Sequence, residues 1–104
     1  MQIALIDTFI VPEESKAALL ERSRAVQSFL KTLPGFVEGY VYEKKAGDNR
    51  HNVITTAVWE NEEALENAKQ TVAEEQQRQN FNIQEFRKQL KIEVERGIYE
   101  RFPY

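Results

Sequence analysis

Apolar side chains occupy both alternating sets of positions near the start of the chain. One set is Ile3, Leu5, Phe9 and Val11, and the other is Ala4, Ile6, Thr8 and Ile10. A strand that is covered on both faces has this composition, whereas a strand with one wet face alternates with polar residues. The pattern therefore predicts a buried strand over residues 2–11.

A helix is predicted over residues 13–32, directly after this strand. Pro12 ends the strand and suits the first turn of a helix, where Glu13 and Glu14 are favourable at the positive end of the helix dipole. Apolar residues then recur at helical spacing and form one face that packs on the sheet. That face is Leu19, Val26, Phe29, Leu30 and Leu33, and the set expected in water is Glu21, Arg22, Arg24 and Lys31.

The next segment predicts a hairpin. The Pro34-Gly35 pair ends the first helix, because proline cannot continue its hydrogen bonds and glycine accepts the turn conformation. Residues 36–44 then alternate as a strand, residues 46–50 have the composition of a hairpin loop, and residues 52–59 form a strand that ends at Trp59.

A second, polar helix follows Trp59 at once. Asn61 is suited to cap it, and Leu65, Ala68 and Val72 recur at helical spacing. We interpret residues 74–77 as a solvated face of this helix. A shorter helix begins with Asn82 and Glu85 as a capping pair, and residues 91–99 form a last strand with Ile92, Val94 and Ile98 on one face.

The order of these elements predicts an α+β fold, the ferredoxin-like split βαβ arrangement with an antiparallel sheet. Both long helices then cover one side of the sheet. The other side carries apolar residues that need burial, among them Ile6, Ile10, Ile54 and Val58. Two such sheets packed face to face would bury them, so we expect a homodimer.

Composition narrows the class of protein. The 104 residues fit a single domain, 1–104, and 41% hydrophobic with 30% charged residues indicates a folded chain. The net charge is -3 and the 14 basic residues are scattered, so neither nucleic acid nor a membrane surface is an expected partner. The absence of cysteine excludes disulfides and thiolate chemistry. No signal peptide is recognisable, and we expect a cytoplasmic protein.

Two residues stand out as candidate chemistry. Asp7 interrupts a strand of apolar residues, so its carboxylate is either paired and hydrogen-bonded or held neutral. If a pocket reaches Asp7, it is the first choice as a general base, and a structural ion pair with an arginine or lysine is the alternative. Trp59 marks a pocket between strand and helix, with core packing as its alternative. His51 is the only histidine, so a histidine-rich metal site cannot form, and we interpret it as a solvated turn residue.

Three segments follow one another in a characteristic order. They are Leu33-Pro-Gly-Phe36, the hairpin at Gly47-Asp48, and the stretch from Thr56 through Trp59 to Leu65. In this order they resemble the antibiotic biosynthesis monooxygenase family of dimeric α+β barrels. The resemblance implies a homodimer whose two sheets form a barrel, with one pocket per subunit between helices and sheet. Members include cofactor-independent oxygenases that act on polycyclic phenols, and haem-degrading enzymes.

The resemblance also assigns roles to individual positions. It places Trp59 in the pocket and Asp7 where the haem-degrading branch has an asparagine. Lys69 stands where that branch binds haem iron through a histidine, and an ammonium is a poor iron ligand. Thr55 and Leu65 replace the asparagine and tyrosine of the phenol-oxidising branch. We expect Asp7 and Trp59 to be catalytic, and the residues lining the pocket to be Thr55, Leu65, Phe36 and Lys69.

The resemblance predicts a cofactor-independent monooxygenase, an oxidoreductase that acts on a small hydrophobic or aromatic molecule and holds neither metal nor cofactor. A non-catalytic ligand-binding or stress-related barrel is the alternative, and haem binding or degradation is a third hypothesis. No serine–histidine–aspartate arrangement or phosphate-binding glycine loop points to a hydrolase or a kinase.

Overall fold

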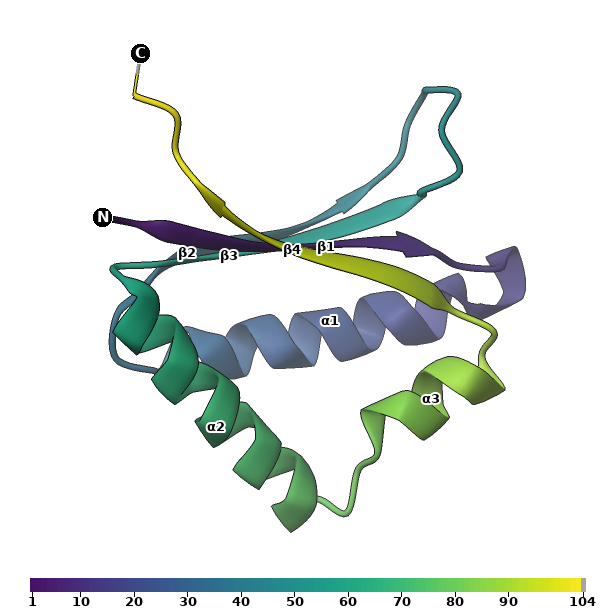
Figure 1. The fold of residues 1–104 in the computed structure, drawn as a ribbon. Coiled ribbons are helices and arrows are strands. Elements are labelled where there is room, and N and C mark those ends of the chain that lie inside the picture. Colours follow the sequence, from purple (N-terminus) through teal and green to yellow (C-terminus); the bar gives the residue numbers. More distant parts are fainter. Residues whose placement is uncertain (104) are drawn as a thin grey trace.

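The chain forms an antiparallel four-stranded sheet with three helices on one side (Figure 1). The computed structural model describes residues 1–103. Strands β2 and β4 are the edges, and the order across the sheet is β2-β3-β1-β4. This confirms the predicted ferredoxin-like α+β fold. The elements are β1 (Ile3–Ile10), the 3-10 turn η1 (Glu13–Ser15), α1 (Lys16–Leu30), β2 (Phe36–Glu43), β3 (Val53–Trp59), α2 (Glu62–Arg78), α3 (Ile83–Gln89) and β4 (Glu93–Glu100).

Local signals explain where the helices begin. Asn61 caps α2, because its side chain accepts a hydrogen bond of 2.8 Å from the backbone N–H of Ala64. Asn82 caps α3 in the same way, with 3.0 Å to the N–H of Glu85. The first helix differs from its prediction, since residues 13–15 form a 3-10 turn and the α-helix ends at Leu30 instead of Thr32.

Strand β1 lies at the centre of the sheet, between β3 and β4. Ile3 is opposite Trp59 of β3, and Asp7 is opposite Arg96 of β4. Because side chains alternate along a strand, Ile3, Leu5, Asp7 and Phe9 share the face that the helices cover. The position of Asp7 among apolar residues of this face is as predicted.

The hydrophobic core is divided into two clusters that lie toward opposite ends of β1. One is built around Ile3 and Trp59, and the other around Phe9 and Val53. Asp7 lies between Ile3 and Phe9 on the same face, opposite Arg96. These polar side chains separate the two clusters at the centre of the sheet. The buried members are Ile3, Leu30, Ala57, Trp59, Leu65 and Ala68 in the first cluster, and Phe9, Val11, Leu19, Val53 and Ile92 in the second.

The second face of the sheet has no covering element among residues 1–103 (Figure 1). It presents Ile6 and Ile10 from β1 and Ile54 from β3, together with Tyr40, Tyr42 and Tyr99, which are each about half exposed. The subunit is accordingly a slab with extents of 40 × 37 × 18 Å. None of the described helices is long and apolar enough to cross a membrane.

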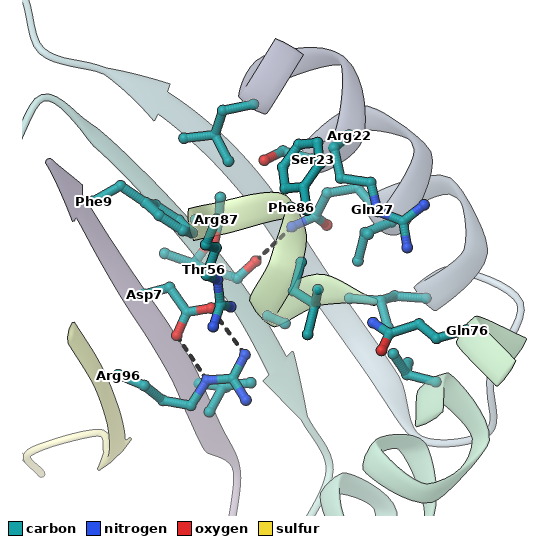
Figure 2. Close-up of a pocket in the computed structure, with 18 residues that line it drawn as sticks. Asp7, Phe9, Arg22, Ser23, Gln27, Thr56, Gln76, Phe86, Arg87 and Arg96 are labelled. Carbon is teal, nitrogen blue, oxygen red and sulfur yellow. Dashed lines mark hydrogen bonds and ion pairs between the residues drawn. The ribbon is translucent and has the colours of Figure 1, made fainter. Parts of the chain in front are cut away.

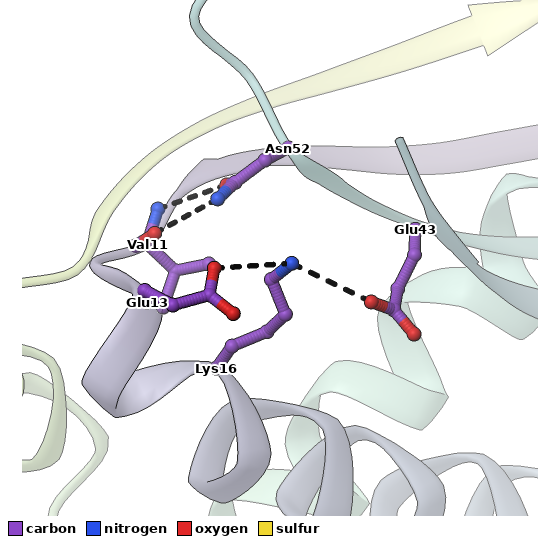
Figure 3. A network of polar contacts seen from close by, with 5 residues as sticks. All are labelled: Val11, Glu13, Lys16, Glu43 and Asn52. Atoms are coloured by element: carbon purple, nitrogen blue, oxygen red, sulfur yellow. Dashed lines mark hydrogen bonds and ion pairs between the residues drawn. The ribbon is translucent and has the colours of Figure 1, made fainter. Parts of the chain in front are cut away.

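One side chain joins the end of β1 to the start of β3 (Figure 3). Asn52 accepts a hydrogen bond of 3.0 Å from the N–H of Val11 and donates one of 2.8 Å to its carbonyl oxygen. Its own N–H donates to the carbonyl oxygen of Phe9 at 2.9 Å. The Asn52 side-chain amide therefore pairs with the backbone of Val11 as the backbone of a neighbouring strand would. Nearby, the ammonium of Lys16 lies between Glu13 and Glu43, at 3.5 and 3.6 Å.

Replacement of Asn52 by alanine should lower the free energy of unfolding by about 2 kcal/mol, because it leaves the N–H and C=O of a buried residue, Val11, unpaired. Asn49→Ala is the matched control, because Asn49 is exposed in the hairpin loop. Chemical denaturation of the two variants measures the difference. Equal stability of the two variants would contradict the assigned role of Asn52.

Candidate functional site

A cleft lies between the sheet and the three helices. It consists of a cavity of about 150 Å³ around Asp7 and a second cavity of about 430 Å³ beside Trp59. We call these the Asp7 cavity and the Trp59 cavity. They share a wall of apolar side chains, so they are two parts of one cleft. The shared apolar residues are Leu5, Val26, Leu30, Ala57, Val72 and Ile83.

A bidentate ion pair lies at the floor of the Asp7 cavity (Figure 2). The Nε and Nη2 atoms of Arg96 donate to the two carboxylate oxygens of Asp7, at 2.8 and 3.0 Å. The Asp7 side chain is 10% exposed and that of Arg96 is 49% exposed. The hydrogen bonds to Asp7 raise the pKa of the Arg96 guanidinium above its usual value. Of the two alternatives for Asp7, the structure shows the paired and hydrogen-bonded carboxylate.

Two further arginines line the same cavity. Arg87 of α3 points toward the Asp7–Arg96 pair (Figure 2). Burial lowers the pKa of Arg87, the charge of Arg96 lowers it further, and the charge of Asp7 opposes the shift. Arg22 of α1 has its guanidinium carbon 3.8 Å from the centre of the Phe81 ring, and burial lowers its pKa as well. Both side chains remain cations at neutral pH, because guanidinium does not lose its proton in proteins.

Gln27 closes one wall of the cavity. Its amide nitrogen donates to the carbonyl oxygen of Thr56 at 3.0 Å, so α1 is joined to the middle of β3. This contact passes over Gly39, where any Cβ would collide with the Gln27 amide and would lie 2.8 Å from the Thr56 carbonyl oxygen. Glycine is therefore required at this point of β2 for the side chain of Gln27 to reach the sheet.

Trp59 forms the wall of the second cavity. The residue is 1% exposed, and Phe36 packs against its ring edge to face, with ring centres 5.4 Å apart and planes at 81°. The indole Nε1 is buried and has no hydrogen-bond partner among the described residues. Core packing and a place in a pocket were the two alternatives for Trp59. Both apply, since Trp59 belongs to the first core cluster and also lines the Trp59 cavity.

The structure distributes the expected site residues over the two cavities. Asp7 and Thr55 line the Asp7 cavity, while Trp59, Leu65 and Lys69 line the Trp59 cavity. Phe36 contacts Trp59 from outside and lines neither cavity.

Several polar residues of the cleft were missed or misplaced by the sequence analysis. Arg22 was expected in water but is half-buried in the Asp7 cavity. It follows Leu19 by three positions and precedes Val26 by four, so it lies on the apolar face of the helix. Gln76 was assigned to a solvated face, but it lines both cavities. It follows Val72 by four positions, so it continues the apolar face of its helix as Arg22 does.

The position of Arg96 in the cleft could have been predicted from the alternation of residues along β4. Arg96 interrupts the apolar set of Val94 and Ile98 on β4 just as Asp7 interrupts that of β1. His51 was expected to be solvated, but it is half-buried with Nε2 3.8 Å from Glu95.

Comparison with known families matches residues 2–81 to the antibiotic biosynthesis monooxygenase model. The chain belongs to this family. The matched segment includes β1, α1, β2, β3 and α2, and therefore Asp7 and Trp59. It ends before α3 and β4, which carry Arg87 and Arg96. Comparison with curated protein sequences gave no match.

Solved structures of similar fold include proteins described as monooxygenases or oxygenases. A candidate monooxygenase from Shewanella loihica has a TM-score of 0.73 at 18% identity, with 99% of this chain and 96% of that chain covered. SnoaB, a cofactor-independent oxygenase from Streptomyces nogalater, has a TM-score of 0.63 at 17% identity, with 99% of this chain and 95% of that chain covered. At these identities the comparisons establish the fold alone.

A haem-degrading protein from Mycobacterium tuberculosis is also similar in fold. Its TM-score is 0.56 at 20% identity, and the match covers 64% of this chain and 74% of that chain. The residue of the Trp59 cavity that stands ten positions after Trp59 is Lys69, whose ammonium lies 3.4 Å from Glu66 at the surface. An ammonium has no lone pair to give to iron, so Lys69 does not suit an iron ligand.

The Asp7–Arg96 pair should contribute measurably to stability. Asp7→Asn and Arg96→Gln should each lower the free energy of unfolding by about 2 kcal/mol, less than for a fully buried pair because Arg96 is half exposed. The double variant should lose about 1 kcal/mol less than the sum. Denaturant titration gives all values. Arg50→Gln, which removes the exposed contact of 3.7 Å to Glu93, is the control and should change little. Additive losses at positions 7 and 96 would contradict the coupling.

Proposed function

We propose that this member of the antibiotic biosynthesis monooxygenase family is a cytoplasmic, cofactor-independent monooxygenase of a small hydrophobic or aromatic molecule. The observation that carries the proposal is the cleft itself, with apolar walls and a few converging polar groups. The Trp59 cavity, of about 430 Å³, has the size of a small-molecule site, which is typically about 300–1,000 Å³. An aromatic ring fits against the apolar wall and the indole of Trp59.

Asp7 is the proposed base. Its carboxylate accepts one hydrogen bond of Arg96 on each oxygen, and each oxygen keeps further lone-pair capacity. It would accept a proton from a phenolic O–H or an activated C–H of the substrate. The carbanion so formed donates electrons to O₂, and the peroxide anion takes the proton back from Asp7 and becomes a hydroperoxide. The carbon that carries the hydroperoxide still holds one hydrogen, so loss of water leaves a carbonyl. One oxygen atom then enters the product and the other leaves as water, so no external reductant is needed.

The proposed assembly is a homodimer joined through the uncovered sheet face. A monomeric protein of 12.2 kDa exposes about 6,100 Å². This subunit exposes 7449 Å². This chain therefore exposes roughly 1,300 Å² more surface than a typical monomer of its mass. The difference exceeds the ~800 Å² that each partner buries in a standard interface. The exposed Tyr40, Tyr42, Ile54 and Tyr99 supply the apolar surface that a second copy would cover.

A non-catalytic ligand-binding protein is the second candidate. Both oxygens of Asp7 accept hydrogen bonds from Arg96, which is the arrangement of a structural ion pair as well as of a positioned base. Thr55 and Leu65 add no group to the cleft that titrates near neutral pH. These two observations favour binding without turnover, and the uptake of oxygen separates the two functions.

Oxygen uptake with a panel of polycyclic phenols, such as dihydroxynaphthalenes, tests the oxygenase. We expect uptake above the spontaneous rate and, with isotopically labelled O₂, one labelled oxygen atom in the product. Asp7→Asn should lower the rate by about 10²–10⁴-fold, the usual effect of removing a general base. Trp59→Phe should raise KM, because the ring loses part of its contact surface.

Asp48→Asn is the matched control, since Asp48 is exposed in the hairpin loop and should leave turnover unchanged. Circular dichroism verifies that the Asp7→Asn variant is folded. Undiminished turnover in folded Asp7→Asn would reject the base, and binding of phenols without any oxygen uptake would favour the second candidate.

Native mass spectrometry tests the dimer. The wild-type chain should appear at twice its subunit mass, and Ile54→Glu should appear as a folded monomer, because the symmetric interface would have to bury two carboxylates. Ala18→Glu places the same charge on the exposed side of α1 and should remain dimeric. A wild-type monomer at micromolar concentration would reject the proposed assembly.

A further inference from the structure

The charge of the cleft is opposite to that of the protein. Four cationic side chains and one carboxylate line the two cavities, whereas the whole chain has a net charge of -3. Asp7 compensates Arg96, and Glu66 lies 3.4 Å from Lys69 at the surface. Arg22 and Arg87 form no ion pair with any residue of the 1–103 segment. The uncompensated positive charge of the cleft therefore belongs to these two arginines.

Hydrogen-bond donors in the cleft also lack acceptors. The Nε atoms of Arg22 and Arg87 and the Nε1 atom of Trp59 are buried without a partner among the described residues. Burying a donor without an acceptor is unfavourable, and more so when the donor is charged. The Phe81 ring compensates part of this cost for Arg22, at 3.8 Å. Arg87 has no such contact and faces the like charge of Arg96. An acceptor with a negative charge is what the cleft lacks.

We propose that the cleft binds an organic anion with a ring-sized apolar body and one carboxylate, which Arg87 and Arg22 hold. The proposal rests on the oxygenase function above and names the charge of its substrate. Guanidinium matches a carboxylate, because its N–H groups form two parallel hydrogen bonds with the two oxygens. The apolar body lies on the wall shared by both cavities, where Leu5, Val26 and Ala57 contact it.

The two arginines differ in their relation to the family match. Arg22 lies within the matched residues 2–81, whereas Arg87 lies beyond them on α3. Arg87 is also the cleft arginine with neither an ion pair nor an aromatic ring against its charge. We therefore assign it the main contact with the carboxylate, and Arg22 on α1, which lines the same cavity, the second.

Calorimetric titration in the absence of oxygen tests the anion site without turnover. It compares 2-naphthoate with 2-naphthamide, which has the same rings and a neutral group of the same shape. We expect the carboxylate to bind at least about tenfold more tightly, as charge-assisted hydrogen bonds predict. Arg87→Gln should remove this preference and leave the affinity for the amide within about twofold. Arg22→Gln should reduce the preference.

Arg78→Gln is the matched control. It removes one positive charge from the exposed end of α2, where Arg78 pairs with Glu75, and should keep the full preference. Circular dichroism verifies folding, and Arg87→Lys, which keeps the charge without the planar fork, should fall between wild type and Arg87→Gln. Equal affinity for both compounds, no binding of 2-naphthoate, or a preference that survives in folded Arg87→Gln would overturn the proposal. Preferential binding of 2-naphthoate together with no oxygen uptake from the phenol panel would instead reject only the oxygenase.

Discussion

A carboxylate at the centre of the sheet imposes the main constraint on this structure. Asp7 lies on the helix-covered face of β1 with its side chain 10% exposed, and a charge in such a place costs several kcal/mol unless it is paired. Its partner Arg96 is 89 residues away in the chain. The pairing of β1 with β4 brings the two residues opposite each other. The pairing of β1 with β4 therefore completes the sheet and also compensates the charge of Asp7.

This charge pair explains why the core is divided. Apolar side chains pack closely around Trp59 at one end of β1 and around Phe9 at the other, but they do not close over an ion pair. The space between the clusters is lined instead by polar groups from three helices and three strands. The cleft is thus a consequence of placing Asp7 in the middle of an apolar strand. The same residue that disturbs the packing is the proposed base.

Local patterns were sufficient for most of the fold and for part of the site. The caps at Asn61 and Asn82 are encoded within three residues of each helix start, and the structure has both. Helical and strand spacing could also have placed Arg22, Gln76 and Arg96 on the covered side of their elements, because each continues an apolar face. That these residues meet in one cleft depends on tertiary packing, which local patterns do not contain. Arg87 is the clearest case, because only the packing of α3 places it beside the Asp7–Arg96 pair.

The two parts of the chain contribute to the cleft in different ways. Residues 2–81, which match the family, supply Asp7 and Trp59, whereas α3 and β4 supply Arg87 and Arg96. On the proposed function, the first part carries the group that removes a proton, the surface for the ring and one contact of the anion, Arg22, and the second part carries the main contact, Arg87. Replacement of Arg87 would then change the charge that the cleft accepts while the base and the tryptophan stay in place. The proposed proton transfer and the proposed selection of charge therefore depend on different elements, β1 and α3, which meet only in the folded cleft.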